Sequence, residues 1–222
     1  MQSPSDNHPN APSFPDLLRC DAIAACGKRE MRDEEYRRRI HSATRELLNE
    51  HGIDSITMYQ IAQTAGIGQG TLYRRYAHVG EVCTDMLKST TGQFLDSLDN
   101  VSATAATPLA QLEETIERII DYVDGKTALF AAISQQYAGK KSFLPHKQPI
   151  AQKLHALLSS MLQRAVDQGE AVPCDVPLTI SALLSTLAPE NYMYYRDTLG
   201  YDKDRYTAGL RRLFIDALRS AK

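Results

Sequence analysis

The sequence has few cysteines and places none of them in a recognisable metal or redox pattern. The four, Cys20, Cys26, Cys83 and Cys174, form no Cys-x-x-Cys pair, and no histidine lies at a zinc-finger spacing from them. We therefore expect reduced thiols in a cytoplasmic protein that needs no metal and no cofactor. A disulfide or a metal site between Cys20 and Cys26 is the alternative, and nothing else in the sequence supports it.

Long apolar runs are missing as well. No stretch approaches the roughly 18 to 20 apolar residues that a helix needs to cross a bilayer. The Pro- and Ser-rich N-terminus has neither the cationic start nor the apolar centre of a secretory signal. These absences favour a cytoplasmic protein without a membrane partner.

The sequence also lacks an excess of positive charge and any catalytic motif. A formal net charge of −2 excludes a uniformly basic coat for nucleic acid, but it leaves room for a local basic patch. No Gly-x-Ser-x-Gly, no P-loop and no set of metal ligands occurs, and Glu113 and Glu114 point to different sides of a predicted helix. We therefore expect no enzyme and no catalytic residues.

Helical periodicity runs from Arg32 almost to the end of the chain, and no convincing strand pattern of period two interrupts it. The pattern predicts an all-α protein of about nine helices. Residues 1–27, rich in proline, are predicted to be a disordered N-terminal extension. Residues 28–88 are predicted to form a small three-helix domain, with a fourth helix that continues to about residue 98. Residues 108–222 are predicted to form a larger helical domain.

Start and stop signals define the first helices. A helix over Asp33–His51 should end at Gly52. Thr57 is the predicted N-cap of the next helix, because Gln60 three residues later completes a capping box. The remaining predicted helices span Gln69–Tyr76, His78–Leu98, Pro108–Gly125, Thr127–Tyr137, Ile150–Gln168, Leu178–Leu199 and Lys203–Ala221.

A glycine-rich break separates two short helices in the segment TAGIGQGTLYRRY, Thr64–Tyr76. Gly66 tolerates the left-handed backbone of a sharp turn, and Ile67 is a predicted apolar plug between the helices. The second helix would then present its first residues outward, as helix-turn-helix readers of the major groove require. Leu72 and Tyr76, four residues apart, should face inward. Base or phosphate contacts are predicted for Gln69, Gly70, Thr71, Tyr73, Arg74 and Arg75.

The order and spacing of these segments match a known family. The pattern I-x-x-A-T-R-E-L-L-N-E-H-G occupies Ile40–Gly52, and I-T-M-Y-Q-I-A-Q-T-A-G-I-G-Q-G-T-L-Y-R-R-Y occupies Ile56–Tyr76. From Arg38 to about Leu87 the chain resembles the DNA-binding domain of TetR-family (TetR/AcrR-type) bacterial transcriptional regulators.

The resemblance implies a homodimeric repressor that binds a palindromic operator in double-stranded DNA and is released by a small-molecule effector. Activation is one alternative. The other is a small-molecule-binding or interaction protein in which the helix-turn-helix is only a packing unit.

The resemblance also implies roles for single residues. Thr57 would contact phosphate, and Tyr59 would lie near the edge of the groove. Residues 69–71 would be closest to the bases, and Tyr73 and Arg75 would bind phosphate.

Two departures from the family pattern remove expected features. Gly68 replaces a Ser-like cap, and Val79 stands where many members carry a phosphate-binding lysine. Basic residues that could compensate, or that could simply form a solvated face, are Lys28, Arg29, Arg32, Arg37 and Arg38.

The C-terminal domain is expected to hold the ligand site and the dimer surface, as in relatives. The predicted pocket residues, which would suit a moderately apolar small molecule, are Tyr122, Phe130, Tyr137, His155, Met161, Leu187, Glu190 and Tyr194. The predicted dimer residues are Leu183, Leu184, Leu210, Leu213, Phe214 and Leu218. For both sets the alternative is the chain's own core, and for the two isolated polar residues, His155 and Glu190, it is an internal hydrogen bond.

Overall fold

The computed structural model describes residues 14–52, 55–101, 107–137 and 149–220, without the side chains of residues 14–29 and 136–137. These residues form an all-α protein, as predicted, and the β structure among them is limited to one isolated bridge between Ala171 and Arg219. No helix in the described ranges combines the length and apolar character needed to cross a membrane.

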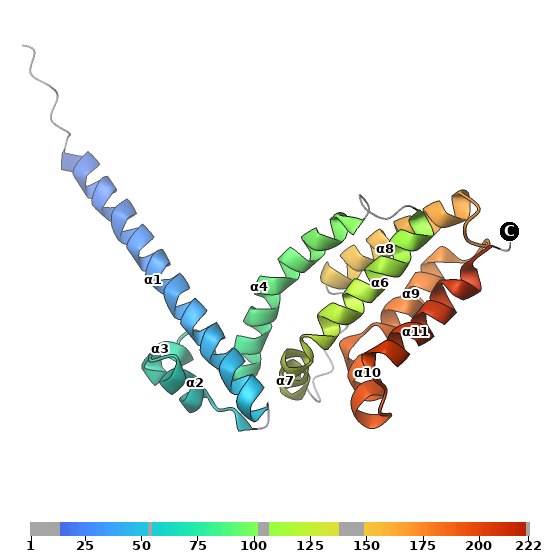
Figure 1. Cartoon of the computed structure of the whole chain (residues 1–222). Coiled ribbons are helices and arrows are strands. Elements are labelled where there is room, and N and C mark those ends of the chain that lie inside the picture. Colours follow the sequence, from blue (N-terminus) through green and yellow to red (C-terminus); the bar gives the residue numbers. More distant parts are fainter. Residues whose placement is uncertain (1–13, 53–54, 102–106, 138–148, 221–222) are drawn as a thin grey trace, which may run out of the picture.

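The N-terminal part consists of one long helix with two short helices beside it and a fourth helix that leads away (Figure 1). These helices are α1 (Phe14–His51), α2 (Met58–Thr64), α3 (Gln69–Tyr73) and α4 (Val79–Asp99). The N-terminal half of α1 projects from the rest of the molecule, whereas its C-terminal half lies against α2 and α4.

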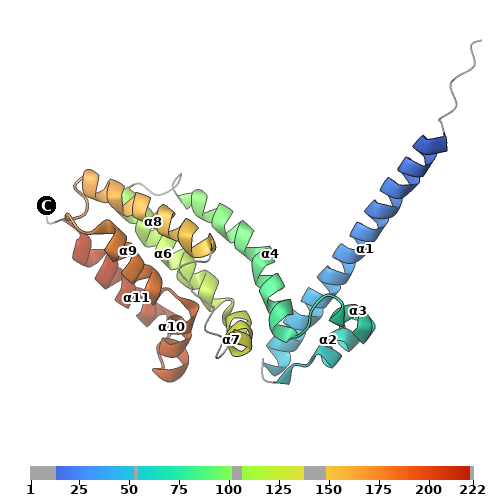
Figure 2. The same ribbon diagram turned by 180° about the vertical axis from the view of Figure 1, so that it is seen from behind.

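The C-terminal part is a bundle in which α6 packs on α8 and α11, and α8 packs on α9 (Figure 2). Its elements are α6 (Pro108–Asp124), α7 (Thr127–Tyr137), α8 (Pro149–Asp167), α9 (Val176–Thr186), α10 (Pro189–Met193), the π-helical turn η3 (Tyr194–Thr198), α11 (Lys203–Phe214) and the 3-10 turn η4 (Asp216–Leu218).

Most predicted helix ends are confirmed, because local side chains determine them. The Thr57–Gln60 capping box is present at the start of α2. Thr107 caps α6 and Pro108 occupies its first turn, and Gly125 follows its end. Gly52 has a φ of 68°, which suits the predicted stop after α1.

Four predicted helices differ from the structure. The predicted Gln69–Tyr76 helix ends as α3 at Tyr73. α1 begins at Phe14, so residues 14–27 are helical rather than disordered, while residues 1–13 lie outside the described part. The segment from Leu17 holds many good helix formers, and Pro15 falls in the first turn, where proline is tolerated.

The predicted Leu178–Leu199 helix is broken. Pro189 cannot donate a backbone hydrogen bond, and the residue before it, Ala188, has an extended ψ of 135°. α9 therefore ends at Thr186, and α10 and η3 follow as separate pieces. The last predicted helix ends as α11 at Phe214 instead of Ala221.

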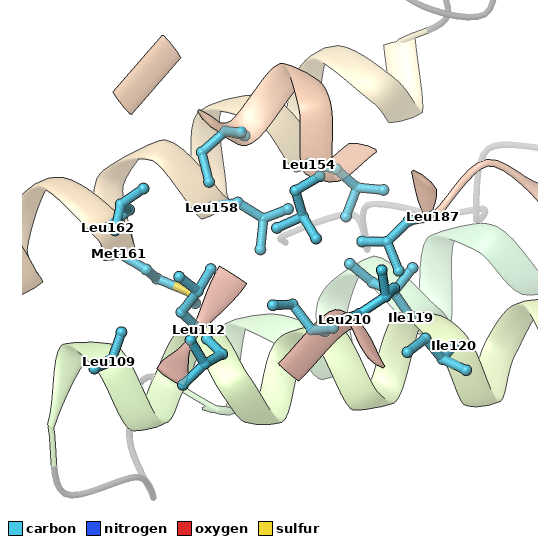
Figure 3. Close-up of a cluster of buried hydrophobic side chains, with 14 of the residues drawn as sticks. Leu109, Leu112, Ile119, Ile120, Leu154, Leu158, Met161, Leu162, Leu187 and Leu210 are labelled. Atoms are coloured by element: carbon cyan, nitrogen blue, oxygen red, sulfur yellow. The ribbon is translucent and has the colours of Figure 1, made fainter. Parts of the chain in front are cut away.

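Two apolar cores stabilise the described part. The larger lies in the C-terminal bundle, where α6 residues such as Leu112 and Ile120 face α8 residues such as Leu158 and Met161 (Figure 3). The smaller lies among α1 to α4. It includes Ile40, Ile61 and Leu72, and also Leu129 and Ala132 of α7. The N-terminal core is therefore completed by a helix of the C-terminal domain.

Helix α4 is shared by the two cores. Val82, Cys83 and Met86 near its start lie in the N-terminal core, and Leu98 near its end lies in the C-terminal core. A single helix thus connects the packing of the two regions.

Candidate nucleic-acid interface

The first helix of the helix-turn-helix is fixed by its capping box. The Thr57 hydroxyl donates to Gln60 Oε1 at 2.8 Å, and the Thr57 backbone N–H donates to the same atom at 2.9 Å. Thr57 is exposed, as a phosphate contact must be, but both of its donors are directed at Gln60. The neighbouring Tyr59 is 58% exposed and faces away from the core.

The turn between α2 and α3 has the predicted construction. Gly66 has a φ of 61°, and Ile67 is partly buried against the N-terminal core. Arg39 of α1 donates from Nη2 to the Gly66 carbonyl at 2.7 Å. The positive φ requires glycine at this position, and a Cβ there would lie 2.7 Å from that same nitrogen, so the Arg39 guanidinium would also have to move.

Helix α3 presents its predicted contact residues to solvent. Leu72 is fully buried, whereas Tyr73 is 53% exposed and Gln69 and Gly70 are exposed. Nothing lies within 4 Å of a Cβ placed on Gly70, so the helix surface there is open to close approach. Gly68 supplies no side-chain cap, as its replacement of a Ser-like residue predicted.

The two arginines after α3 differ in their surroundings. Arg74 is exposed and donates to Thr71 Oγ1 at 3.3 Å. Arg75 is half-buried: its Nη2 lies 2.5 Å from Asp33 Oδ1, and its guanidinium carbon lies 5.4 Å from the centre of the Tyr36 ring. Arg75 is therefore held by α1 at a position from which it would have to release Asp33 to bind a phosphate.

The basic run on α1 is also engaged within the chain. Arg38 pairs with Glu35 at 2.8 Å, Arg39 binds the turn at Gly66, and Arg37 pairs with Asp85 of α4 at 2.8 Å. Arg32 is exposed, and the side chains of Lys28 and Arg29 lie outside the described residues. At Val79, where a lysine was expected, the side chain packs against the N-terminal core.

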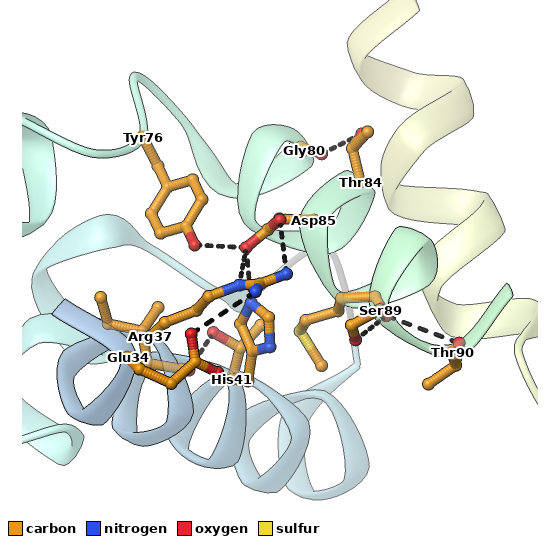
Figure 4. Close-up of polar contacts among 12 residues, drawn as sticks. Glu34, Arg37, His41, Tyr76, Gly80, Thr84, Asp85, Ser89 and Thr90 are labelled. Atoms are coloured by element: carbon orange, nitrogen blue, oxygen red, sulfur yellow. Dashed lines mark hydrogen bonds and ion pairs between the residues drawn. The ribbon is translucent and has the colours of Figure 1, made fainter. Parts of the chain in front are cut away.

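Asp85 lies at a polar junction that the sequence did not predict. Its Oδ2 accepts a hydrogen bond from the Tyr76 hydroxyl at 2.6 Å and one from Arg37 Nε at 2.8 Å, and its Oδ1 accepts one from Arg37 Nη2 at 3.1 Å (Figure 4). His41 Nε2 lies 3.0 Å from Oδ2. A signal was available: Val82, Asp85 and Met86 share one face of α4, and that face is buried on both sides of the carboxylate.

Burial and charge set the protonation of this group. Burial favours the neutral carboxyl of Asp85, but hydrogen bonds from Arg37 and Tyr76 outweigh it, and the pKa of Asp85 is lowered. Burial lowers the pKa of His41 below 6.5, against the opposing hydrogen bond to Asp85. The neutral imidazole therefore donates from Nε2 to the carboxylate.

The cysteines in the described part are free thiols. Burial raises the pKa of Cys83 to about 12, so this thiol is unreactive at neutral pH. The side chains of Cys20 and Cys26 lie outside the described residues. Within the described ranges, no three His, Cys, Asp or Glu side chains gather as metal ligands.

The predicted pocket residues are spread over different environments. Met161 and Leu187 lie in the close-packed C-terminal core, and Phe130 lies at its edge. Tyr122 stacks on Phe94 with ring centres 4.1 Å apart. Glu190 and Tyr194 are exposed.

His155 lies between two serines, with its ring nitrogens 3.4 Å from Ser159 Oγ and 3.3 Å from Ser181 Oγ. The internal hydrogen bond weighed for His155 is therefore present. The side chain of Tyr137 lies outside the described residues.

A cleft of about 280 Å³ opens instead at the junction of the two regions. It is lined by Arg45, Leu48, Asn49, Met86, Thr90, Gly125, Lys126 and Leu129. None of these was predicted as a pocket residue, because the cleft forms only where α1, α4 and the α6–α7 turn meet.

The predicted dimer residues divide between core and surface. Leu183 and Leu210 are buried in the chain's own core, and Leu184, Phe214 and Leu218 are partly buried against it. Leu213 is 63% exposed, and Leu178 of α9, which was not predicted, is 67% exposed. Exposed apolar side chains thus occur on both α9 and α11.

Comparison with known proteins supports the resemblance seen in the sequence. Residues 40–77 match the family model described as "Bacterial regulatory proteins, tetR family". The matched range runs from Ile40 of α1 through the turn and α3. Residues 40–77 are therefore a TetR-family helix-turn-helix region.

Curated proteins and solved structures similar to this chain agree with that match. The HTH-type transcriptional regulator SAB2452 of Staphylococcus aureus (strain bovine RF122 / ET3-1) is 26% identical over 96 residues, which cover 43% of this chain and 52% of the relative. The chain thus spans about half the length of the curated relatives it matches.

Among solved structures, a TetR transcription regulator from Haloarcula marismortui ATCC 43049 matches with a TM-score of 0.65 and 18% identity, over 84% of this chain and all of the other. FadR from Bacillus subtilis, solved in complex with stearoyl-CoA, matches with a TM-score of 0.58 and 22% identity, over 82% of this chain and 98% of the other. These two structures support the fold.

Proposed function

We propose that this TetR-family regulator represses transcription by binding an operator in double-stranded DNA through α3. The observation that carries the proposal is the surface of α3: Leu72 is buried as its anchor, while Gln69, Gly70 and Tyr73 face solvent. A Gln side chain can donate to and accept from a base edge, and the open space at Gly70 permits close approach to the duplex. Thr71 is half-exposed beside them and completes the base-proximal set.

Contacts to phosphate would position α3 on the duplex. Thr57 and Tyr59 on the α2 side and Tyr73, Arg74 and Arg75 on the α3 side are the proposed contacts. Thr57 would exchange Gln60 for a phosphate oxygen, and Arg75 would exchange Asp33. Both exchanges are between polar partners that solvent can reach, so the free energy lost on release is small.

The regulator would act as a symmetric homodimer, because a five-residue helix reads too few bases alone. In two-fold dimers of helix-turn-helix proteins, recognition helices enter half-sites about 34 Å apart. The exposed Leu178 and Leu213 on α9 and α11 are proposed as apolar centres of the interface, with Leu184, Phe214 and Leu218 at its edge. Leu183 and Leu210 would support that surface from inside.

A small, moderately apolar effector is proposed to bind the C-terminal domain and release DNA. The FadR structure with stearoyl-CoA is similar in fold and holds a ligand with a long apolar acyl chain. Of the predicted pocket residues, Tyr122 contacts α4 directly, since it stacks on Phe94 of that helix. A ligand there would bias α4, and DNA would weaken effector binding by the same factor.

Fluorescence anisotropy would test the proposal with DNA that flanks the gene for this chain, over a salt series and with nonspecific competitor. We expect tight binding to one segment, and affinity that falls steeply with salt as phosphate contacts release counterions. Gln69→Ala should change the preferred sequence, whereas Tyr73→Ala should weaken all sequences alike. Weak binding that is equal on all DNA would overturn the proposal.

A further inference from the structure

A single carboxylate joins α4, α1 and the segment that follows the recognition helix α3. Asp85 belongs to α4, its partners Arg37 and His41 belong to α1, and its partner Tyr76 lies three residues after the end of α3 (Figure 4). The shortest of these hydrogen bonds, at 2.6 Å, is the one from the Tyr76 hydroxyl.

Tyr76 moves with α3 because the helical backbone continues into it. The amides of Arg75 and Tyr76 both donate to the Leu72 carbonyl, at 2.9 and 3.0 Å. Anchoring the Tyr76 side chain therefore anchors the C-terminal end of the recognition helix.

Helix α3 needs such an anchor. A helix of five residues has too few hydrogen bonds to be stable by itself. Within it only Leu72 is buried, and one buried side chain leaves the helix free to rotate about that point. Ile67 restrains the first end of α3, and the bond from Tyr76 to Asp85 restrains the second.

We propose that Asp85 is a positioning residue that sets the angle of α3 and ties it to α4 through the hydroxyl of Tyr76. The inference deepens the proposed function and rests on it. When α4 moves, Asp85 moves with it and takes the end of the recognition helix along. This polar contact acts in addition to apolar packing. The apolar side chains of α4 are connected to Leu72 only as members of the same N-terminal core.

The variant Tyr76→Phe isolates this contact. It keeps the ring that packs against the N-terminal core and removes only the hydroxyl. Asp85 keeps both bonds from Arg37 and the one from His41, so its charge stays compensated and the domain should remain folded.

The chain offers a matched control in Tyr192→Phe. The Tyr192 hydroxyl also donates to a carboxylate oxygen, Asp124 Oδ1, at 2.6 Å, but this contact joins α10 to α6 in the C-terminal bundle. Both variants lose one hydrogen bond from a tyrosine hydroxyl to an aspartate.

The first measurement is the affinity of the full chain and both variants for the operator segment found by anisotropy. We expect Tyr76→Phe to bind about fivefold more weakly, as the loss of one hydrogen bond predicts, with an unchanged salt slope. Tyr192→Phe should bind like the parent. Equal affinities for all three proteins would overturn the proposal.

A second measurement needs no DNA and separates this proposal from the proposed function. In Tyr76→Phe, the amides of Arg75 and Tyr76 should exchange hydrogen about fivefold faster than in the parent, while amides of α4 stay unchanged. If the parent recognises no operator but these two amides exchange faster in Tyr76→Phe than in the parent, the proposed function fails and the positioning role stands. If these amides exchange at the same rate in both proteins, the positioning role fails.

A mutant cycle with Asp85→Ala identifies the partner. In that background, Tyr76→Phe should have no further effect on exchange or affinity, because its acceptor is gone. Additive effects would show that the hydroxyl acts through another group and would also overturn the assignment to Asp85.

Discussion

The N-terminal and C-terminal regions of this protein differ in the size of their apolar core and in where their polar contacts lie. The C-terminal bundle has a broad apolar core to which α6 and α8 contribute along their length, and polar contacts such as Arg164 with Gln111 join its helices. The N-terminal domain has a smaller core, and its polar contacts hold the two ends of α3: Arg39 binds the Gly66 carbonyl before that helix, and Asp85 binds Tyr76 after it. Apolar packing tolerates small rotations of one helix against another, whereas hydrogen bonds are directional and fix the angle between them. A helix that binds DNA needs a fixed angle, because contacts to the duplex set its orientation.

The largest expected effect separates stability from DNA binding. Leu158→Ala removes a fully buried side chain from the C-terminal core and should lower the free energy of unfolding by about 2–5 kcal/mol. Thermal or urea unfolding of the full chain would measure this. DNA affinity, measured well below the unfolding temperature, should remain within about twofold, because no contact of α3 changes.

Leu72→Ala is the counterpart in the N-terminal domain. Leu72 is equally buried but anchors only α3. A loss of about 2 kcal/mol of docking free energy would weaken operator binding by about thirtyfold. If Leu158→Ala weakened DNA binding as strongly as Leu72→Ala does, the separation of the two regions would be wrong.

The next effect concerns the turn. Gly66→Ala places a Cβ at a positive φ and 2.7 Å from Arg39 Nη2, so we expect a loss of about 1–3 kcal/mol of stability. Urea unfolding would measure it.

Gly70→Ala is the matched control, because its Cβ would have nothing within 4 Å and its φ is not positive. Its stability should be unchanged or raised by up to about 1 kcal/mol, while operator affinity falls, because the methyl group meets DNA. Similar losses of stability in the two variants would contradict the geometry of the turn.

The parts that the sequence predicted are those with local causes. The Thr57–Gln60 capping box, the Gly66 turn and the burial of Leu72 depend on residues close in the chain. The break at Pro189 also has a local cause, which is the extended conformation that a proline favours in the residue before it.

What could not be predicted depends on distant residues. Arg37 and Asp85 are 48 residues apart, and Leu129 of α7 joins a core made otherwise by α1 to α4. The predicted pocket residues whose side chains are described lie in different environments, since periodicity identifies a buried face without saying what lies opposite. The contact of Arg75 with Asp33 is likewise invisible without the fold.

The polar contacts also predict a pH dependence for the N-terminal domain. Burial lowers the pKa of His41 below 6.5, with repulsion from Arg37 and Arg45 of α1 adding to it and Asp85 of α4 opposing it. Tyr76, whose hydroxyl donates to Asp85, is the other titratable side chain at this junction. As pH falls below about 6.5, the unfolded chain binds a proton on this histidine before the folded domain does, so stability declines.

Urea unfolding followed between pH 7.5 and pH 5 would measure this decline. The control is His41→Gln, which can still donate to Asp85 but does not titrate, and it should lose less stability over that range. The lowered pKa of Asp85 adds its own loss only at lower pH, below about 4, where the unfolded carboxylate is protonated first. An identical pH profile for parent and variant would exclude His41 as the cause.

The smallest expected effect would raise DNA affinity. Asp33→Asn removes the carboxylate that holds Arg75, and it leaves the cation beside the Tyr36 ring and available to phosphate. Because exposed ion pairs contribute little, we expect operator and nonspecific DNA to bind about twofold to fivefold more tightly. The slope of log affinity against log salt should steepen by up to about 0.9, the value for one more neutralised phosphate.

The matched control is Glu35→Gln, which frees Arg38 on the same helix. We propose no phosphate contact for Arg38, so this variant should leave the slope unchanged. A steeper slope in both variants would mean that net charge alone determines affinity, and an unchanged slope in Asp33→Asn would remove Arg75 from the phosphate contacts.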